Sequence, residues 1–249
     1  MNKKQKIHLI MPMGGGGTRF GNKGFSLPKP LIPLKERPFF FWAAQSLLKF
    51  IEVQDLTFVV LKDHVERFSI DREIRAYYKD ARILVIPEVL NGAVLTCLEG
   101  IRDFTDDLPV FFNDCDHAFL CSPFYCFCEN ADFSSPDGAL LTFTSDSPNF
   151  SYVRFDKNGR LVGTVEKVVA SDQAICGAYF FKNSQIFRQF SERYLKNCSY
   201  SEYFVSGVYN EMAKEGLSLV NFPLELHISF GTPAEYDEAL TNTQLGRLL

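Results

Sequence analysis

The residues most suggestive of chemistry lie between positions 14 and 30, where four glycines precede an arginine and a lysine stands between two prolines. Glycines let a backbone turn tightly and approach a ligand closely, and their free N–H groups form a concavity for anions. Arg19 adds a planar set of donors that fits phosphate oxygens. Pro28 and Pro30 restrict the chain around Lys29, which holds its ammonium group in place. These residues predict a phosphate-binding site.

Two common nucleotide motifs do not fit this segment. No Gly-Lys-Ser or Gly-Lys-Thr follows the glycines, so a Walker A loop is excluded. The dinucleotide pattern would need a glycine at Arg19. Taken alone, the glycine run also fits a flexible turn, and the Pro-Lys-Pro segment is what favours function.

A second candidate lies at positions 110–117, where an apolar run ends in Asp114 and Asp116. Ligands bind beyond the carboxyl ends of parallel strands, so carboxylates there can hold Mg²⁺ against phosphates. The alternative is an acidic turn in solvent. Seven cysteines without a small secreted framework favour reduced thiols and a cytoplasmic protein. The cluster Cys115, Cys121, Cys126 and Cys128 lacks paired CxxC spacing, which favours buried small side chains over zinc.

The elements that must position these residues alternate between strands and helices. Strands are predicted at 7–11, 56–61, 83–86 and 110–113, with helices at 39–50 and 93–101. The second half predicts strands at 139–144, 153–155, 161–165 and 178–181 and helices at 184–195, 201–215 and 234–245. This order predicts an α/β, Rossmann-like fold with a mixed, mostly parallel sheet flanked by helices. We expect a single domain over 1–249, with a nucleotide-binding lobe at about 1–118 and an acceptor-binding lobe at about 119–249.

Overall composition excludes several partners. The net charge of −4 argues against broad nucleic-acid binding. No apolar run approaches the ~18 residues that a membrane-spanning helix needs. Neither nucleic acid nor a membrane is therefore expected as a partner, and the oligomeric state, a homo-oligomer included, stays open.

The segment 14–20, GGGGTRF, followed by PKPLIPL at 28–34 resembles the sugar-phosphate nucleotidylyltransferase superfamily. The likeness is greatest to compact bacterial members of capsule and lipopolysaccharide pathways. It implies an NTP substrate, a small phosphorylated acceptor and Mg²⁺. By this resemblance Gly14, Gly15 and Gly17 cradle the nucleotide, Arg19 holds the β- and γ-phosphates, and Lys29 neutralises charge at the α-phosphate.

The resemblance continues to about position 240. It implies that Asp116 binds the metal and that Asp114 is a second ligand or a helper. Asn91 and Gly92 fall where relatives contact the base. Glu166 and Gly177 are implied at the acceptor, with Lys167 on its phosphate. His117 could contact the substrate, but a surface or capping residue is the favoured interpretation.

One position departs from the family pattern. Larger relatives read D-I-G-T-P where this chain has SFGTP at 229–233, so Ser229 replaces an aspartate that supplies a second metal ligand. The leading hypothesis is nucleotidyl transfer with release of pyrophosphate, with CTP or GTP favoured and a hexose, heptose or non-sugar phosphate as acceptor. The alternatives are a nucleotide-sugar-dependent glycosyltransferase and a catalytically inactive nucleotide-binding protein.

Overall fold

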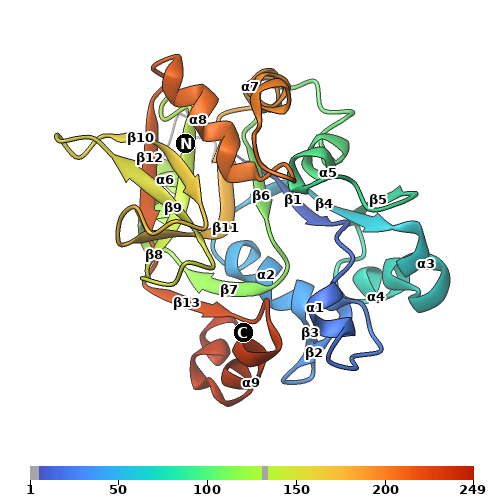
Figure 1. Ribbon diagram of the computed structural model, residues 1–249. Helices are drawn as coiled ribbons and strands as arrows, with labels where there is room; N and C mark the ends of the chain where they lie inside the picture. Colours follow the sequence, from blue (N-terminus) through green and yellow to red (C-terminus); the bar gives the residue numbers. More distant parts are fainter. Residues whose placement is uncertain (1–5, 131–133) are drawn as a thin grey trace.

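The strands of the central sheet come from both halves of the chain. The computed structural model describes residues 6–130 and 134–249. In these residues the sheet contains β1 (Ile7–Met13), β4 (Val53–Leu61), β5 (Arg82–Ile86), β6 (Val110–Asn113), β8 (Gly138–Thr144), β9 (Ser151–Phe155), β10 (Leu161–Glu166), β11 (Gln173–Phe181) and β12 (Leu219–Pro223). The strand order is β10-β9-β11-β6-β1-β4-β5, and β8 pairs with both β11 and β12 (Figure 1).

Helices cover both faces of this sheet (Figure 1). They are α1 (Thr18–Gly21), α2 (Phe39–Leu48), α3 (Lys62–Phe68), α4 (Ile70–Tyr77), α5 (Ala93–Gly100), α6 (Ser122–Asn130), α7 (Ser184–Asn197), α8 (Val205–Lys214) and α9 (Pro233–Thr241), with 3₁₀ turns at Lys29–Leu31 and Thr243–Leu248. Successive residues of β1 pack on opposite faces, because strand side chains alternate. Leu9 and Met11 join the cluster that contains α2, α4 and α6, whereas Ile10 joins the cluster with α5, α7 and α8.

The parallel strands of the sheet place the loops that follow them at one edge. β1 runs parallel to β4 and β6, and β4 runs parallel to β5. The glycine segment after Met13 and the acids after Asn113 therefore leave the sheet at the same edge. This is the edge at which open α/β sheets bind ligands.

β11 joins the two halves, since it pairs antiparallel with β6, β8 and β9. Its register with β8 shifts between Ile175 and Tyr179, so residues 176–178 form an irregular stretch. Gly177 lies in it with φ at +96°, a left-handed conformation that suits glycine. Its carbonyl accepts a hydrogen bond from the Asp114 backbone N–H at 2.9 Å, which ties β11 to the acidic turn.

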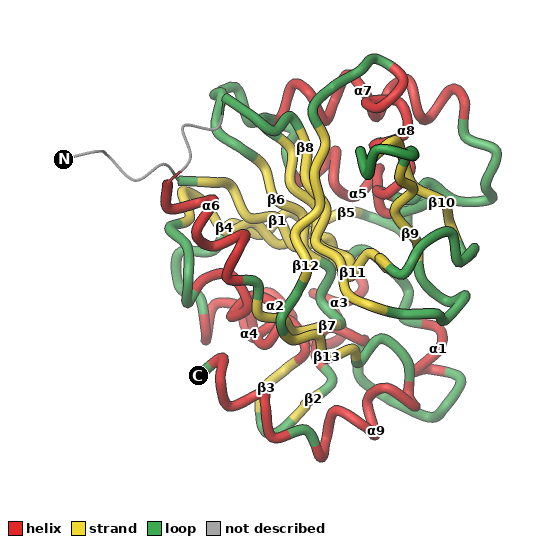
Figure 2. The backbone as a smooth tube through the Cα atoms, turned by 90° about the vertical axis from the view of Figure 1, so that its left-hand side faces the viewer, coloured by secondary structure: helices red, strands yellow, loops and turns green. Residues whose placement is uncertain are grey.

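Two small ribbons complete the fold. β2 (Pro33–Leu34) pairs with β3 (Arg37–Pro38), and β7 (His117–Leu120) pairs with β13 (Leu226–Ser229). Figure 2 shows β7 and β13 side by side below the main sheet. The β7–β13 ribbon therefore brings residues 117–120 and 226–229 together, although more than a hundred residues separate them in sequence.

The predicted α/β fold with a mixed sheet flanked by helices is confirmed. Several boundaries differ from the sequence expectations. The helix expected at 201–215 begins at Val205, because the backbone of Tyr203 instead bonds with Asn91 and Val94. The strand expected at 178–181 begins at Gln173, where it pairs with β8. In the described parts of the chain, no helix is long and apolar enough to cross a membrane.

Candidate active site

The glycine segment and the Pro-Lys-Pro segment meet at a small cavity. Its volume is about 160 Å³, and it is lined by Pro12, Met13, Gly15, Gly17, Lys29, Pro30, Asp114, Cys115 and Asp116. Gly17 has φ at +60°, and a Cβ there would lie 3.2 Å from the Cβ of Lys29. A side chain at position 17 would thus crowd the lysine, so this glycine is required by both conformation and space.

Gly14 lies beneath the cavity instead of lining it. A Cβ at this position would be 2.7 Å from Cδ1 of Ile86 and 3.1 Å from Cγ2 of Thr96. An alanine here would therefore press on the side chains of Ile86 in β5 and Thr96 in α5. Gly92 has φ at +102° and packs directly on the Tyr203 backbone. Neither Asn91 nor Gly92 lines the cavities around Lys29.

Lys29 and Asp116 form an ion pair at the centre of the site. The Lys29 Nζ atom donates to Oδ2 of Asp116 at 2.8 Å, and the side chains are 28% and 24% exposed. Burial alone would lower the pKa of Lys29, but the charges of Asp116, Cys115 and Asp114 and the hydrogen bond to Asp116 together outweigh burial, and the pKa is raised. Burial likewise opposes the charged form of Asp116, but the charge and hydrogen bond of Lys29, together with His117 and a backbone hydrogen bond, keep its pKa below the usual value. Both groups are therefore charged at neutral pH.

The pKa of Asp114 is shifted in the opposite direction to that of Asp116. Burial raises its pKa to about 7, and the negative charge of Asp116 adds to the effect. Its carboxylate lies against Gly177, where a Cβ would come within 2.8 Å of Oδ2. Asp114 and Asp116 line both the small cavity and a larger neighbour, so they stand at the junction of the two.

The larger cavity extends from this junction into the second half of the chain. Its volume is about 590 Å³. It is lined by Arg19, Asp114, Asp116, His117, Asn149, Phe150, Ser151, Glu166, Ile175, Cys176, Gly177, Tyr179, Phe204, His227, Ser229, Gly231, Thr232, Ala234 and Glu235. Acids, amides, hydroxyls and aromatic rings thus share its wall. A pocket of this size accommodates a small ligand that is both polar and apolar.

Glu166 lines the larger cavity, whereas its neighbour Lys167 does not. The Glu166 carboxylate accepts hydrogen bonds from the hydroxyls of Ser151 and Ser206, and burial raises its pKa. Lys167 has φ at +55° and places its Nζ atom 5.4 Å from the centre of the Phe204 ring. Lys167 is exposed and does not line the cavity, so the structure brings Glu166 but not Lys167 to this wall.

His117 corrects the sequence expectation of a surface residue. It is 2% exposed, because β7 is covered by β13 and the ring stacks on Phe119. Burial lowers its pKa to about 4, against the opposing charge of Asp116. Burial also lowers the pKa of His227 to about 3, with a further contribution from His117. The β7–β13 pairing was not predicted, and the sequence signal for it was the polar–apolar alternation of residues 226–229.

The carboxylates at the junction suit a hard cation whose shell is completed by substrate. Among the described residues, no group of three or more His, Cys, Asp or Glu side chains could hold a metal ion. Mg²⁺ commonly binds one or two carboxylates together with phosphate oxygens, so Asp114 and Asp116 fit this ion. A Cβ at Gly231 would lie 2.6 Å from Oδ2 of Asp116, and glycine therefore leaves this carboxylate accessible. Cys115, Cys121 and Cys128 are buried, as expected for small core residues, whereas Cys126 is exposed, contrary to that expectation.

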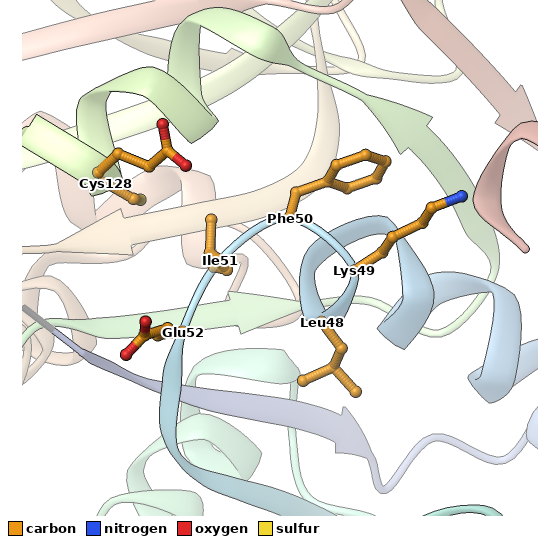
Figure 3. Close-up of a pocket in the computed structure, with 7 residues that line it drawn as sticks. Leu48, Lys49, Phe50, Ile51, Glu52 and Cys128 are labelled. Carbon is orange, nitrogen blue, oxygen red and sulfur yellow. The ribbon is translucent and has the colours of Figure 1, made fainter. Parts of the chain in front are cut away.

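A further cavity lies at the other end of the sheet. Its volume is about 270 Å³, and it is lined by Leu48, Lys49, Phe50, Ile51, Glu52, Cys128 and Glu129 (Figure 3). Glu52 directly precedes β4, so this cavity lies at the amino end of the parallel strands. None of the predicted catalytic or ligand-binding residues lines it, and it is separate from the site described above.

Comparison with known proteins identifies the family to which this chain belongs. Residues 8–243 match the family model described as "Nucleotidyl transferase". The chain therefore belongs to the nucleotidyl transferase family, and the resemblance inferred from its motifs is confirmed. No match is found among curated protein sequences.

Solved structures of other proteins share this fold. The nucleoside-diphosphate-sugar pyrophosphorylase from Vibrio cholerae RC9 has a TM-score of 0.79 and 19% identity, over 94% of this chain and 100% of that chain. The inositol-1-phosphate CTP transferase from T. maritima has a TM-score of 0.75 and 14% identity, over 100% of this chain and 96% of that chain. At these identities the likeness establishes the fold, and the roles of individual residues stay predictions.

Proposed function

We propose that this nucleotidyltransferase transfers a nucleoside monophosphate unit from an NTP to a small phosphorylated acceptor and releases pyrophosphate. The observation that carries the proposal is the Lys29–Asp116 ion pair where the two cavities meet. The small cavity, with its glycine backbone and Lys29, suits the phosphates of the NTP. The larger cavity suits the acceptor. CTP or GTP is the favoured NTP, on the resemblance of the motifs to those of compact bacterial relatives.

The proposed reaction is an in-line displacement. A phosphate oxygen of the acceptor forms a bond to the α-phosphorus, and the bond from that phosphorus to the bridging oxygen of the β-phosphate breaks. Pyrophosphate leaves with the electron pair. The attacking oxygen is already anionic, so no general base is needed, and catalysis rests on positioning and charge neutralisation.

The chain's own residues supply most of that positioning. Lys29 neutralises the α-phosphate, and Arg19, which lines the larger cavity and not the small one, binds the pyrophosphate as it leaves. Lys167, which lies outside both cavities beside Phe204, binds the acceptor phosphate. Asp114 and Asp116 would hold Mg²⁺. When bound, the ion supplies positive charge that draws the two anionic substrates together. A cytoplasmic role in building a bacterial surface polysaccharide is consistent with the motifs of compact relatives and forms part of the proposal.

Pyrophosphate release tests the proposal. The purified protein is incubated with Mg²⁺, each of four NTPs and a panel of sugar and non-sugar phosphates. We expect release with one NTP that depends on an acceptor, and a loss of ~10²–10³-fold in rate for Asp116→Asn. Asp172→Asn, on the exposed turn before β11, is the control and should retain wild-type turnover.

Three results would count against the assignment. Normal turnover in a folded Asp116→Asn variant would remove the carboxylate from the mechanism. Release of nucleoside diphosphate from a nucleotide sugar, without pyrophosphate release from any NTP, would instead favour a glycosyltransferase. NTP binding without turnover of any acceptor would favour the inactive nucleotide-binding protein.

A further inference from the structure

Two histidines face the larger cavity from the β7–β13 ribbon. In the antiparallel register His117 stands opposite Ser229, and His227 stands opposite Phe119. Residues that face each other across a ribbon, and residues two apart along one strand, share a face. The two imidazole rings are 5.8 Å apart between centroids. Both histidines line the larger cavity, and neither lines the small cavity with Lys29.

The ring nitrogens of these histidines lack the hydrogen bonds that buried polar groups normally make. Neither Nδ1 nor Nε2 of His117 makes a hydrogen bond of normal geometry among the described residues, and neither does Nε2 of His227. The Gly177 backbone lies close enough to His117 to oppose part of the pKa decrease that burial causes, but it does not complete a hydrogen bond of normal geometry. All three atoms are fully buried, and His117 as a whole is 2% exposed. Burying an unpaired nitrogen is unfavourable, so such atoms at a cavity wall indicate a polar ligand.

Aromatic neighbours hold both imidazole rings in fixed positions. His117 stacks on Phe119 with ring centroids 5.5 Å apart, and His227 packs on Phe143 at 3.9 Å. Ser229, opposite His117, is too short and carries no charge to form an ion pair with it. The nitrogens are therefore held ready for a ligand, and little ordering is needed when one binds.

We infer that His117 and His227 bind hydroxyl groups of the phosphorylated acceptor and thereby determine which acceptor the enzyme selects. The inference rests on the proposed function, because it takes the larger cavity as the acceptor site. A neutral imidazole offers one N–H donor and one nitrogen acceptor, and a hydroxyl group can both donate and accept. The two side chains are thus complementary to a polyhydroxylated acceptor.

The other residues that line the larger cavity also suit a polyhydroxylated acceptor. Asn149 and Ser151 add an amide and a hydroxyl, while Phe150 and Phe204 present aromatic rings. Such a wall suits a ring that carries hydroxyl groups on one side and C–H groups on the other. An acceptor without hydroxyl groups would leave the histidine nitrogens unpaired, and a site of this type rejects it.

Imidazole NMR tests the inference without relying on turnover. The protein has four histidines, so each ring can be assigned, and His64 serves as an internal control because it lies outside both cavities. The probes are inositol 1-phosphate, glucose 1-phosphate and choline phosphate. Each is added with Mg²⁺ and α,β-methylene analogues of CTP and GTP, which cannot lose pyrophosphate. We expect a hydroxylated probe to shift the ring signals of His117 and His227, with His64 unchanged.

Substitution provides a second measurement. In His117→Phe and His227→Phe we expect KM for the hydroxylated acceptor to rise ~10- to 100-fold, the effect of losing one or two hydrogen bonds, with KM for the NTP unchanged. Glutamine at either position should restore part of the loss, since its amide both donates and accepts. His64→Phe is the matched control, because His64 is also buried with an unpartnered ring nitrogen.

The outcomes separate this inference from the proposed function. Shifted histidine signals without pyrophosphate release would support the inference and count against nucleotidyl transfer to that acceptor. Pyrophosphate release without any shift at His117 or His227 would support the transfer and overturn the inference. Equal shifts with choline phosphate, or an equal rise in both KM values, would also overturn it.

Discussion

At the scale of single residues, the surroundings of Lys29 hold its ammonium group in one place and keep it charged. Pro28 and Pro30 restrict its backbone, Gly17 packs on its Cβ, and Asp116 accepts a hydrogen bond from its Nζ atom. An arriving phosphate would meet an ammonium group that needs no reorientation. Preorganised charge of this kind accelerates reactions because it is aimed at the developing negative charge in advance.

Lys29→Gln should therefore abolish most activity. Glutamine keeps much of the length but removes the charge, so we expect kcat/KM for pyrophosphate release to fall by ~10²–10³-fold. Circular dichroism should show an unchanged fold. Lys23→Gln, at an exposed position of the same segment, is the control and should retain the wild-type rate. Wild-type kcat/KM in the folded Lys29→Gln variant would remove this residue from the mechanism.

Gly177 offers a second test at the same scale. Gly177→Ala places a methyl group within 2.8 Å of the Asp114 carboxylate at a φ of +96°, so we expect both displacement of that carboxylate and loss of turnover. Gly159 also has positive φ, at +76°, but a Cβ there meets no atom within 4 Å. Gly159→Ala is therefore the matched control: both variants should lose ~1 kcal/mol of stability from backbone strain. Equal steady-state rates for the two variants would contradict the proposed contact.

The main strands and helices could be read from the sequence, because long apolar runs and regular spacing carry a strong signal. The pairing of β7 with β13 could not be predicted, because each strand has only four residues and the two strands are far apart in the sequence. His117 was consequently expected at the surface. The same pairing places His227 and Ser229 beside the acidic turn, so the wall of the larger cavity depends on a contact that local sequence does not specify.

The ribbon should also make folding stability sensitive to acid. Burial holds the pKa of His227 at about 3, below the ordinary value of 6.5. Between those values the unfolded chain binds a proton that the folded chain does not, so stability falls as pH decreases below about 6.5. His227→Phe removes this contribution. The loss of unfolding free energy between pH 7.5 and pH 5 should shrink by on the order of 2 kcal/mol.

Urea unfolding of the wild type and of His227→Phe at the two pH values measures this effect. The comparison is made within each protein, so any change in packing caused by phenylalanine cancels. His64 and His117 also have lowered pKa values and should retain the rest of the acid sensitivity. The same pH dependence in both proteins would mean that His227 is protonated in the folded state.

At the scale of the whole molecule, β11 connects the parallel strands that lead to the glycine segment with the antiparallel strands that line the larger cavity. The two cavities share Asp114 and Asp116 at this connection. Nucleotide and metal should therefore stabilise each other's binding, and binding should stabilise the whole fold. A ligand that binds only the folded state at 100 times its Kd adds about 2.7 kcal/mol.

Thermal unfolding with each NTP in Mg²⁺ or in EDTA measures that coupling. We expect one NTP to raise Tm by several degrees in Mg²⁺, because a few kcal/mol shifts Tm by that amount in a protein of this size. EDTA should remove most of the increase, since without the cation the NTP phosphates repel Asp114 and Asp116. Asp116→Asn should show a smaller difference between Mg²⁺ and EDTA than the wild type. If the wild type gains the same Tm in EDTA as in Mg²⁺, the carboxylates at the junction do not hold the ion.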